Sequence, residues 1–444
     1  MRQTILSGVM LLLATIALET RAAEQAENTP ESLAREFVTQ LAQGDYREAV
    51  SSFDSKMSHH LPEDKLQKLW EGISGQWGEF QEIQSIRLQK VPQYQIALVT
   101  CRFEKGLLDV KVVFTANQQI AGLFFLPAGR YQSPSYVKPN RFKETEVTIG
   151  TGLWSLPGTL SVPVMGKKVP AVVLVHGSGP QDRNETTGPN QPFRDLAEGL
   201  ASQGIAVLRY EKRTKHHRLK MVLLSGSLTV REETIDDAVA AVQFLQSQAR
   251  IDRTRVFVLG HSLGGYLLPQ LGAEAQGIAG LISLAGSARP LEEIVLEQVK
   301  YLSALNGEAA EVSQQKLQEL EKQVAMVKSL ELKPETPAGQ LPLGIPASYW
   351  LALRGYDAAE RARTLQMPLL ILQGQRDYQV TMDDFARWKQ ALRNRKDVRF
   401  ISYPKLNHLF MAGEGPGTPA EYMITGNVAE EVVRDIAAWI ADQK

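Results

Sequence analysis

A serine between two glycines is the clearest candidate for chemistry in this chain of 444 residues. Ser262 stands in the sequence Gly260-His261-Ser262-Leu263-Gly264, directly after an apolar run at 256–259 that predicts a short buried strand. An apolar run with helical character follows at 263–274. A sharp turn from strand to helix lifts a serine hydroxyl clear of a sheet, and flanking glycines let the backbones approach closely there. A chance match would be an ordinary turn, but the strand before and the helix after favour a nucleophile.

Seven histidines are candidates for the base that a serine hydroxyl needs beside it to become an effective nucleophile. Six of the seven stand in unsuitable places: two in an N-terminal segment, two in a cationic run that we interpret as a solvated loop and that would lower the pKa of a base, one directly before the serine and one at a strand end (His59, His60, His216, His217, His261 and His176). The remaining histidine, His408, follows the last predicted strand. We therefore predict that His408 is the general base.

The base must in turn be oriented by an acid, which lies between serine and histidine in one common chain order. Asp377 leaves the end of the strand predicted at 367–373 and so stands where such an acid belongs. The two aspartates that come next open the following helix, where carboxylates act as caps. The predicted catalytic triad is Ser262, Asp377 and His408.

Attack on a carbonyl also requires N–H groups that stabilise the negative oxygen. The sequence His176-Gly177-Ser178-Gly179 follows a predicted strand, and a glycine-rich turn there can aim a backbone N–H at this oxygen. The start of the helix after the nucleophile offers a second N–H. We predict that the N–H groups of Ser178 and Leu263 form the oxyanion hole. The alternative is a phosphate-binding turn, but the lysine and the fuller glycine pattern of a P-loop are absent.

These residues need a scaffold that brings the ends of distant strands together. Between residues 141 and 444 we predict strands at 144–149, 158–164, 171–176, 205–210, 255–259, 278–284, 367–373 and 398–403, and helices at 192–203, 234–248, 263–274, 382–392 and 428–441. Continuous apolar strands that alternate with helices indicate a mostly parallel sheet covered on both faces. The predicted fold class of this region is α/β.

A long interval without a predicted strand interrupts the alternation at about 287–362. Helical runs at 291–305 and 312–332 are followed by several prolines. An insert here would lie over the carboxyl ends of the strands, where α/β sheets place their sites, so we interpret it as a helical lid, with a purely structural helical bundle as the alternative. Near its end, Trp350 and Arg354 are candidate substrate-binding residues, although such side chains could equally anchor the lid to the sheet.

Residues 31–127 are interpreted as a separate small α+β domain. Helical patterns at 30–43, 46–53 and 62–72 precede strand patterns at 80–89, 94–103, 107–115 and 119–125. Residues 128–140 contain prolines, a glycine and polar residues, which indicate a linker to the domain at 141–444. The adjacent His59 and His60 are interpreted as solvated residues of a polar loop, so no chemistry is assigned to the first domain.

The N-terminus and the composition bear on location and partners. Arg2, an apolar run at 5–18 and small residues up to Ala23 indicate a cleaved signal peptide at 1–23; the run is shorter than the roughly 20 residues of a membrane span. We therefore expect an exported protein, periplasmic or secreted, without stable membrane insertion. Lys plus Arg and Asp plus Glu number 49 each, which argues against a nucleic-acid partner. With Cys101 as its one cysteine, the chain has no internal disulfide.

Four motifs in this order resemble those of the α/β-hydrolase superfamily: residues 176–183, 260–265, 373–377 and Asn407-His408. Residues 141–444 look closest to bacterial exported hydrolases of the serine aminopeptidase, prolyl oligopeptidase-like and dienelactone hydrolase-like branches. This resemblance implies triad roles for Ser262, Asp377 and His408. In one departure, the segment at 209–213 resembles a family segment that usually continues with glycine, but threonine follows here. Residues 31–127 resemble a small domain of unknown function related to the nuclear-transport-factor-2-like fold.

The predicted function is that of a serine hydrolase that cleaves a carboxylic ester through an acyl-enzyme, with a small-molecule acyl ester as substrate. A peptidase or amidase is an alternative. A peptidase that recognises a free amino terminus would need a carboxylate in the lid to bind the amine, and Glu292, Glu293 and Glu297 are the candidates. A non-catalytic ligand-binding protein on a hydrolase scaffold is the other alternative. We expect no metal or organic cofactor, because neither a zinc-like spacing nor a dinucleotide fingerprint is present.

Overall fold

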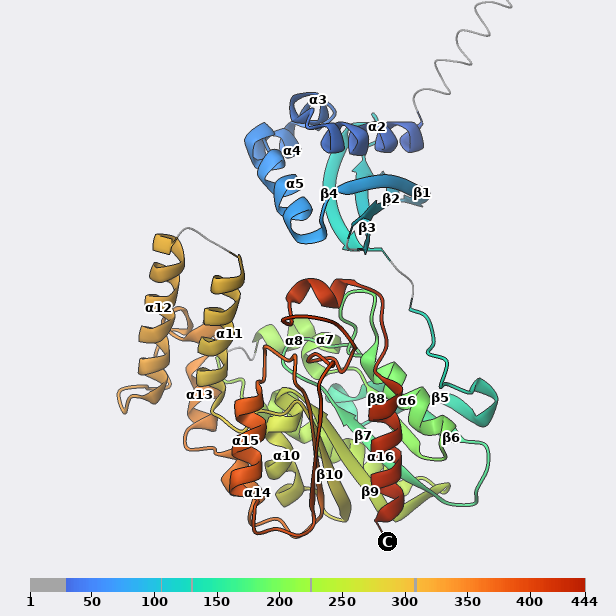
Figure 1. The fold of residues 1–444 in the computed structure, drawn as a ribbon, viewed down its shortest axis with the longest axis vertical. Coiled ribbons are helices and arrows are strands. Elements are labelled where there is room, and N and C mark those ends of the chain that lie inside the picture. The colour runs from blue at the N-terminus through green and yellow to red at the C-terminus, as the bar shows by residue number, and fades with distance from the viewer. Residues whose placement is uncertain (1–28, 105, 129–130, 224–225, 307–309, 444) are drawn as a thin grey trace, which may run out of the picture. The chain divides into compact units, whose positions relative to one another are not determined.

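The computed structural model in Figure 1 describes residues 29–104, 106–128, 131–223, 226–306 and 310–443. The chain divides into two compact units, one of residues 1–130 with 423–425 and one of residues 131–422 with 426–444. The expected signal peptide at 1–23, and residues 129–130 of the expected linker, lie outside the described residues. Within the described ranges, no helix combines the length and the apolar character that crossing a membrane requires.

The N-terminal unit packs helices against an antiparallel sheet of four strands in the order β1-β2-β3-β4. Its elements are α2 (Pro30–Gln43), α3 (Tyr46–Ser51), α4 (Ser55–His60), α5 (Glu63–Trp77), β1 (Phe80–Val91), β2 (Tyr94–Phe103), β3 (Gly106–Phe114) and β4 (Ile120–Pro127). Side chains such as Phe37 of α2, Trp70 of α5 and Phe103 of β2 fill the space between helices and sheet. The expected small α+β domain is confirmed.

Helix α4 differs from the expectation for this unit. Asp54 caps it, because its side chain accepts a hydrogen bond from the N–H of Met57 at 2.7 Å. The helix has no buried residue, so no apolar periodicity could reveal it in the sequence. His59 and His60 therefore lie in the last turn of a helix rather than in a loop.

The larger unit is built on an eight-stranded sheet in the order β12-β11-β10-β9-β7-β8-β6-β5. Its strands are β5 (Phe142–Ile149), β6 (Leu156–Pro163), β7 (Val169–Val175), β8 (Ala206–Tyr210), β9 (Ile251–His261), β10 (Ile278–Leu284), β11 (Leu369–Gly374) and β12 (Val398–Tyr403). The strands from β8 to β12 in this order pair in parallel, whereas β6 and β5 form an antiparallel edge. The α/β fold class is therefore confirmed.

Helices cover both faces of this sheet (Figure 1). One layer contains α9 (Asp236–Ser247), α10 (Leu263–Glu274), α14 (Ala358–Ala362) and α15 (Met382–Ala391), and the other α6 (Pro192–Ser202) and α16 (Glu430–Asp442). The central strand β7 explains the arrangement. Val173 and Val175 pack into the first layer, while Val172 and Leu174 pack into the second, so the strand must be apolar on both sides.

The interval without strands forms a helical insert, from α11 (Leu291–Asn306) and α12 (Ala310–Lys328) to α13 (Ala347–Leu353) and α14. Helices α11 and α12 lie side by side (Figure 1), with Val295 packed against Leu320 and Val324. The insert also has a small core around Trp350 of α13. Because these apolar clusters are separate from the two layers that cover the sheet, the insert has hydrophobic cores of its own and is a packed part of the fold rather than a long loop.

The cationic run that contains His216 and His217 is also more ordered than expected. It forms two short helices, α7 (Arg213–His216) and α8 (Arg218–Leu223), in place of a solvated loop. His217 Nε2 lies 3.0 Å from the carbonyl oxygen of Ser155.

Candidate active site

Ser262 lies at the turn between β9 and α10. Its backbone angles, φ 52° and ψ −115°, are sparsely populated by residues with a side chain, and such strain is typical of a nucleophile held at a sharp turn. Both flanking glycines are required because a side chain at either position would clash with a neighbouring backbone. A Cβ at Gly260 would overlap the carbonyl group of Gly264, and a Cβ at Gly264 would overlap that of Val175 on β7. The glycine spacing therefore follows from the close approach of β9, α10 and β7.

His408 and Asp377 are in direct contact. The distance from His408 Nδ1 to Asp377 Oδ2 is 2.6 Å, and the two side chains are only 4% and 0% exposed. The amide of Gln373 also donates to Oδ2, at 3.1 Å, while Oδ1 accepts the backbone N–H groups of Gln379 and Val380 at 2.8 and 3.0 Å. These donors fix the carboxylate. A proton on Nδ1 of His408 leaves its Nε2 able to accept another.

The residue before the nucleophile ties the base to the turn. His261 Nε2 donates to the carbonyl oxygen of His408 at 3.0 Å, and the two rings lie 4.6 Å apart between centroids. Because His261 is bonded to Ser262, this contact holds the loop of the base beside the nucleophile. The structure thus pairs Asp377 with His408 and ties the backbone of His408 to the residue before Ser262, with the three residues following β11, β12 and β9. The triad role of Ser262 stays a prediction.

Ser178 follows β7, and Leu263 begins α10. Both line the same cavity as Ser262. Within the described part of the chain, neither N–H is bonded to another backbone group, as expected for Leu263 at the start of a helix. Gly177 brings the turn close, since a Cβ there would lie 3.1 Å from the Cβ of Ser262. Two uncommitted donors beside a nucleophile are what an oxyanion hole requires.

The cavity that opens onto Ser262 has a volume of about 640 Å³. Its apolar lining comes from α8, the segment between α8 and α9, α10, the insert and the loop after β11 (Met221, Val222, Leu228, Leu263, Tyr266, Leu291, Ile294, Val295, Leu343, Ile345, Pro346, Tyr349 and Val380). Glu233, Lys215 and Arg218 also contribute to the wall. An apolar cavity of this size with few polar groups is typical of small-molecule sites.

Trp350 and Arg354 lie away from this lining. Trp350 is 1% exposed within the small core of the insert, and Arg354 donates to the carbonyl oxygen of Ser329 at 2.9 Å. Both side chains thus join parts of the insert to one another, which is neither of the two roles expected for them. Tyr349 lines the cavity in their place, because neighbouring residues of a helix point to different sides.

The three glutamates considered for holding an amine do not line the cavity either. Glu293 pairs with Lys328 at 2.6 Å, and Glu297 pairs with Arg289. Glu292 has a raised pKa because it is partly buried. The insert therefore presents none of the expected carboxylates to a substrate amine.

Charged side chains that the sequence did not predict are buried behind the oxyanion turn, residues 176–179. Glu185 Oε2 lies 2.9 Å from His261 Nδ1. Burial alone would raise the pKa of Glu185, but the facing imidazole and the N–H of Gly177 lower it overall. Burial alone would lower the pKa of His261, but Glu185 and the carbonyl of His408 raise it overall. Charged residues usually lie on the surface, so the burial of Glu185 could not be expected from its residue type. Its place in the sequence, shortly after His176, was the one signal that it lies near the site.

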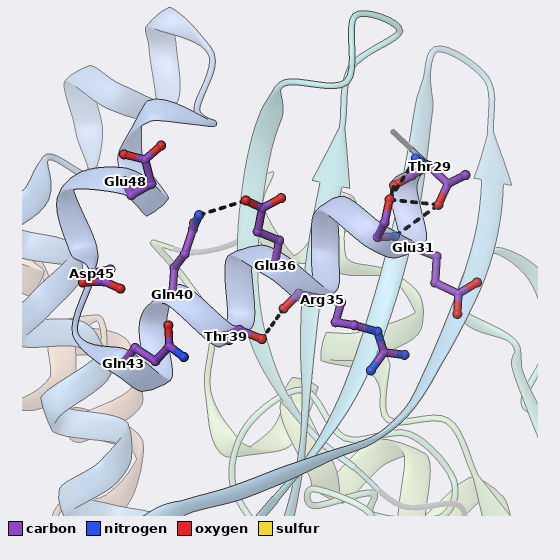
Figure 2. Close-up of a pocket in the computed structure, with 10 residues that line it drawn as sticks. Thr29, Glu31, Arg35, Glu36, Thr39, Gln40, Gln43, Asp45 and Glu48 are labelled. Carbon is purple, nitrogen blue, oxygen red and sulfur yellow. Dashed lines mark hydrogen bonds between the residues drawn. The ribbon is translucent and has the colours of Figure 1, made fainter. Parts of the chain in front are cut away.

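The N-terminal unit carries a polar hollow along α2, which Figure 2 shows. Its lining consists of polar and charged side chains from α2 and its N-cap and from the start of α3 (Thr29, Glu31, Ser32, Arg35, Glu36, Thr39, Gln40, Gln43, Asp45 and Glu48). Several of them bond to their own helix, as Thr39 does to the carbonyl oxygen of Arg35 at 2.8 Å. Nowhere among the described residues do three potential metal ligands of the types His, Cys, Asp and Glu gather.

The two units of the chain match two different protein families. The family model described as serine aminopeptidase, S33, matches residues 166–414, and the model described as a protein of unknown function (DUF3887) matches residues 34–123. Esterase EstD of Thermotoga maritima is 39% identical over 406 residues, which cover 91% of this chain and 93% of that protein.

Two solved structures are also similar. Est1E from Butyrivibrio proteoclasticus has 17% identity and a TM-score of 0.43, with 67% of this chain and 99% of that chain covered. The acylaminoacyl peptidase of Pyrococcus horikoshii has 16% identity and a TM-score of 0.45, with 82% of this chain and 51% of that chain covered. The relation of the first domain to the nuclear-transport-factor-2-like fold stays a prediction.

Proposed function

Because the chain belongs to the serine aminopeptidase S33 family of α/β-hydrolases, we propose that it is a serine hydrolase that cleaves carboxylic esters through an acyl-enzyme. The proposal is supported by three features that follow the carboxyl ends of parallel strands: the strained turn at Ser262, the apolar cavity that Ser262 lines, and the His408–Asp377 pair. The similarity to Esterase EstD over 91% of the chain supports an ester as substrate.

In the acylation step, His408 Nε2 takes the proton of the Ser262 hydroxyl as its oxygen attacks the ester carbonyl carbon. Asp377 accepts the Nδ1 hydrogen bond and stabilises the imidazolium that forms. The N–H groups of Ser178 and Leu263 bind the oxyanion, each worth about 3 kcal/mol in such sites. The bond to the alcohol oxygen then breaks, and His408 returns its proton to the leaving alkoxide.

In the deacylation step, water takes the place of the alcohol. His408 removes one proton from this water, and the resulting hydroxide attacks the acyl carbon. The same two N–H groups bind the second oxyanion. The bond to the Ser262 oxygen breaks, and the proton on His408 restores the hydroxyl, so the enzyme returns to its starting state with the carboxylic acid released.

The cavity favours a small or medium apolar ester. Its wall is mostly aliphatic, and its volume of about 640 Å³ lies within the range of small-molecule sites. An aminopeptidase would need a carboxylate for the substrate amine. Glu293 is paired with Lys328, and Glu233, which does line the cavity, is paired with Lys212. These pairings favour ester cleavage over recognition of a free amino terminus.

Hydrolysis of a substrate panel tests the proposal. The panel contains p-nitrophenyl esters from acetate to laurate together with aminoacyl and prolyl p-nitroanilides. The wild type is measured beside Ser262→Ala and beside Ser247→Ala, a matched control on the exposed side of α9. We expect ester turnover that falls at least about a thousandfold in Ser262→Ala and stays unchanged in the control. Anilide turnover equal to ester turnover would instead assign a peptidase.

We propose further that the protein is exported, to the periplasm or the medium. The support is the short cationic start, the apolar run at 5–18 and the small residues before Glu24. Expression of the full chain with its own N-terminus, followed by fractionation and N-terminal sequencing, tests this. A mature protein that begins near residue 24 outside the cytoplasm is expected, and a full-length cytoplasmic protein would refute it.

A further inference from the structure

Lys212 is a buried cation that the catalytic steps above do not use. It follows β8, and its side chain is 3% exposed. Its Nζ donates to the carbonyl oxygen of Gly177 at 2.6 Å and lies 2.5 Å from Glu233 Oε1. A buried ammonium is costly unless it is paired and hydrogen-bonded, and Lys212 satisfies both conditions. What matters for the reaction is where its second partner lies.

The carbonyl of Gly177 belongs to the same peptide unit as the N–H of Ser178. A peptide unit is planar, so fixing its oxygen also fixes the direction of its N–H. A cation at the oxygen draws electron density from the amide, and hydrogen bonds in series polarise one another. The ammonium therefore makes the Ser178 N–H a better donor to an oxyanion. Glu185 Oε1 accepts the N–H of Gly177 at 2.7 Å, which holds the turn from its other side.

The partner of Lys212 lies in the cavity wall. Glu233 stands on a π-helical turn, Arg231–Ile235, which leads into α9. Its second carboxylate oxygen accepts a hydrogen bond from the hydroxyl of Tyr349 at 2.6 Å. Tyr349 belongs to α13 of the insert and lines the same cavity. A continuous chain of charge-assisted hydrogen bonds thus runs from the insert to the oxyanion turn.

We propose that Lys212 is a positioning residue of the oxyanion hole, with its ammonium fixing and polarising the Gly177–Ser178 peptide while Glu233 and Tyr349 hold that ammonium in place. The inference rests on the proposed ester hydrolysis through Ser262. Lys212 acts through the peptide and does not touch the substrate. Its loss therefore weakens transition-state binding and leaves ground-state binding of an apolar ester unchanged.

The test is a double variant, Lys212→Met with Glu233→Gln, which removes both charges and leaves no unpaired buried ion. The neighbouring ion pair supplies a matched control, because Arg213, next to Lys212 in the sequence, and Asp237 of α9 are also buried and paired. The control variant is Arg213→Met with Asp237→Asn. Removing a whole oxyanion donor costs about a hundredfold to a thousandfold, so an effect that acts through the donor should be about tenfold to a hundredfold.

We expect kcat for p-nitrophenyl butyrate to fall about tenfold to a hundredfold in the Lys212/Glu233 variant, with KM within about threefold of the wild type. Affinity for an alkyl trifluoromethyl ketone, which forms a tetrahedral adduct with an oxyanion, should fall by the same factor as kcat/KM. The control pair should change neither quantity by more than about threefold. A loss of packing alone would not weaken the adduct selectively.

A kcat and an adduct affinity within about threefold of the wild type would overturn the inference, as would an equal loss in the control pair. If the Met variant does not fold, Lys212→Gln with Glu233→Gln replaces it. That amide can still donate to Gly177, so about a tenfold loss of kcat is expected, and a loss below about threefold again overturns the inference. Ser262→Ala separates the two proposals: full activity there would refute the ester-hydrolase mechanism itself.

Discussion

The substitution Asp377→Asn should reverse the proton arrangement of His408. Two backbone N–H groups, those of Gln379 and Val380, point at Oδ1, so the amide oxygen of an asparagine must take that place. Its NH₂ group then occupies the place of Oδ2 and faces His408 Nδ1 at the present 2.6 Å contact. Only an unprotonated Nδ1 can accept from an amide. The proton must move to Nε2, which then cannot take the proton of Ser262.

The magnitude follows from this change of tautomer. The same substitution in a well-studied serine protease lowers kcat by about 10⁴, which corresponds to a barrier higher by about 5 kcal/mol. In the wild type the amide of Gln373 donates to Oδ2 of Asp377 at 3.1 Å, so in the variant this amide faces the new NH₂ group. Two donors in contact in a buried site should lower the free energy of unfolding by about 1 to 3 kcal/mol.

The assay is kcat for p-nitrophenyl butyrate at neutral pH, together with urea unfolding of each variant. Asp383→Asn is the control, because Asp383 is an exposed carboxylate at the start of α15. We expect the control to keep its kcat within about twofold. A folded Asp377→Asn enzyme that retains more than a tenth of the wild-type kcat would refute the assignment of Asp377 as the residue that orients the base.

Three further predictions address the scaffold and the cavity. Gly264→Ala places a Cβ against the carbonyl of Val175 and should cost about 3 kcal/mol or more in urea unfolding; a smaller cost would contradict the tight packing of the turn. Burial lowers the pKa of His176 to about 4 from its ordinary value of 6.5. As pH falls below 6.5, this imidazole therefore binds a proton in the unfolded chain but stays neutral in the folded chain. Stability should therefore decrease from pH 6.5 to pH 4 by up to about 3 kcal/mol from this group, and unfolding of His176→Gln at both pH values should lack that part of the slope; equal slopes would refute it. Ile294→Trp fills part of the cavity, so kcat/KM should fall at least about tenfold for the octanoate ester but less than threefold for the acetate, and an unchanged chain-length profile would place the acyl group elsewhere.

Much of the hydrolase fold could be predicted because its signals are local. The strand at β9, the two glycines and the helix α10 follow each other in one short run, and each piece constrains the next. Asp377 could be found because it leaves a continuous apolar strand. The carboxyl ends of parallel strands meet at one edge, so residues at such ends converge even when they are far apart in the sequence.

What could not be predicted depends on tertiary contacts. Helix α4 buries no residue, and α7 and α8 are only 4 and 6 residues long, so none of them has the sustained periodicity that reveals a helix. Trp350 and Tyr349 are adjacent in sequence, and only the rotation of α13 decides which one reaches the cavity. Lys212 and Glu233 are residue types that usually lie in solvent, and their burial depends on a pairing across 21 positions.

The central claim is that Ser262 carries the acyl group, and covalent labelling tests it most directly. The folded protein is treated with a fluorophosphonate, which reacts with activated serines, and its intact mass and labelled peptide are then determined. The wild type should gain one label, on the peptide that contains Ser262, and Ser262→Ala should gain none. A label on another residue, an equal label on Ser262→Ala, or no label on a folded wild type that still hydrolyses esters would contradict the account.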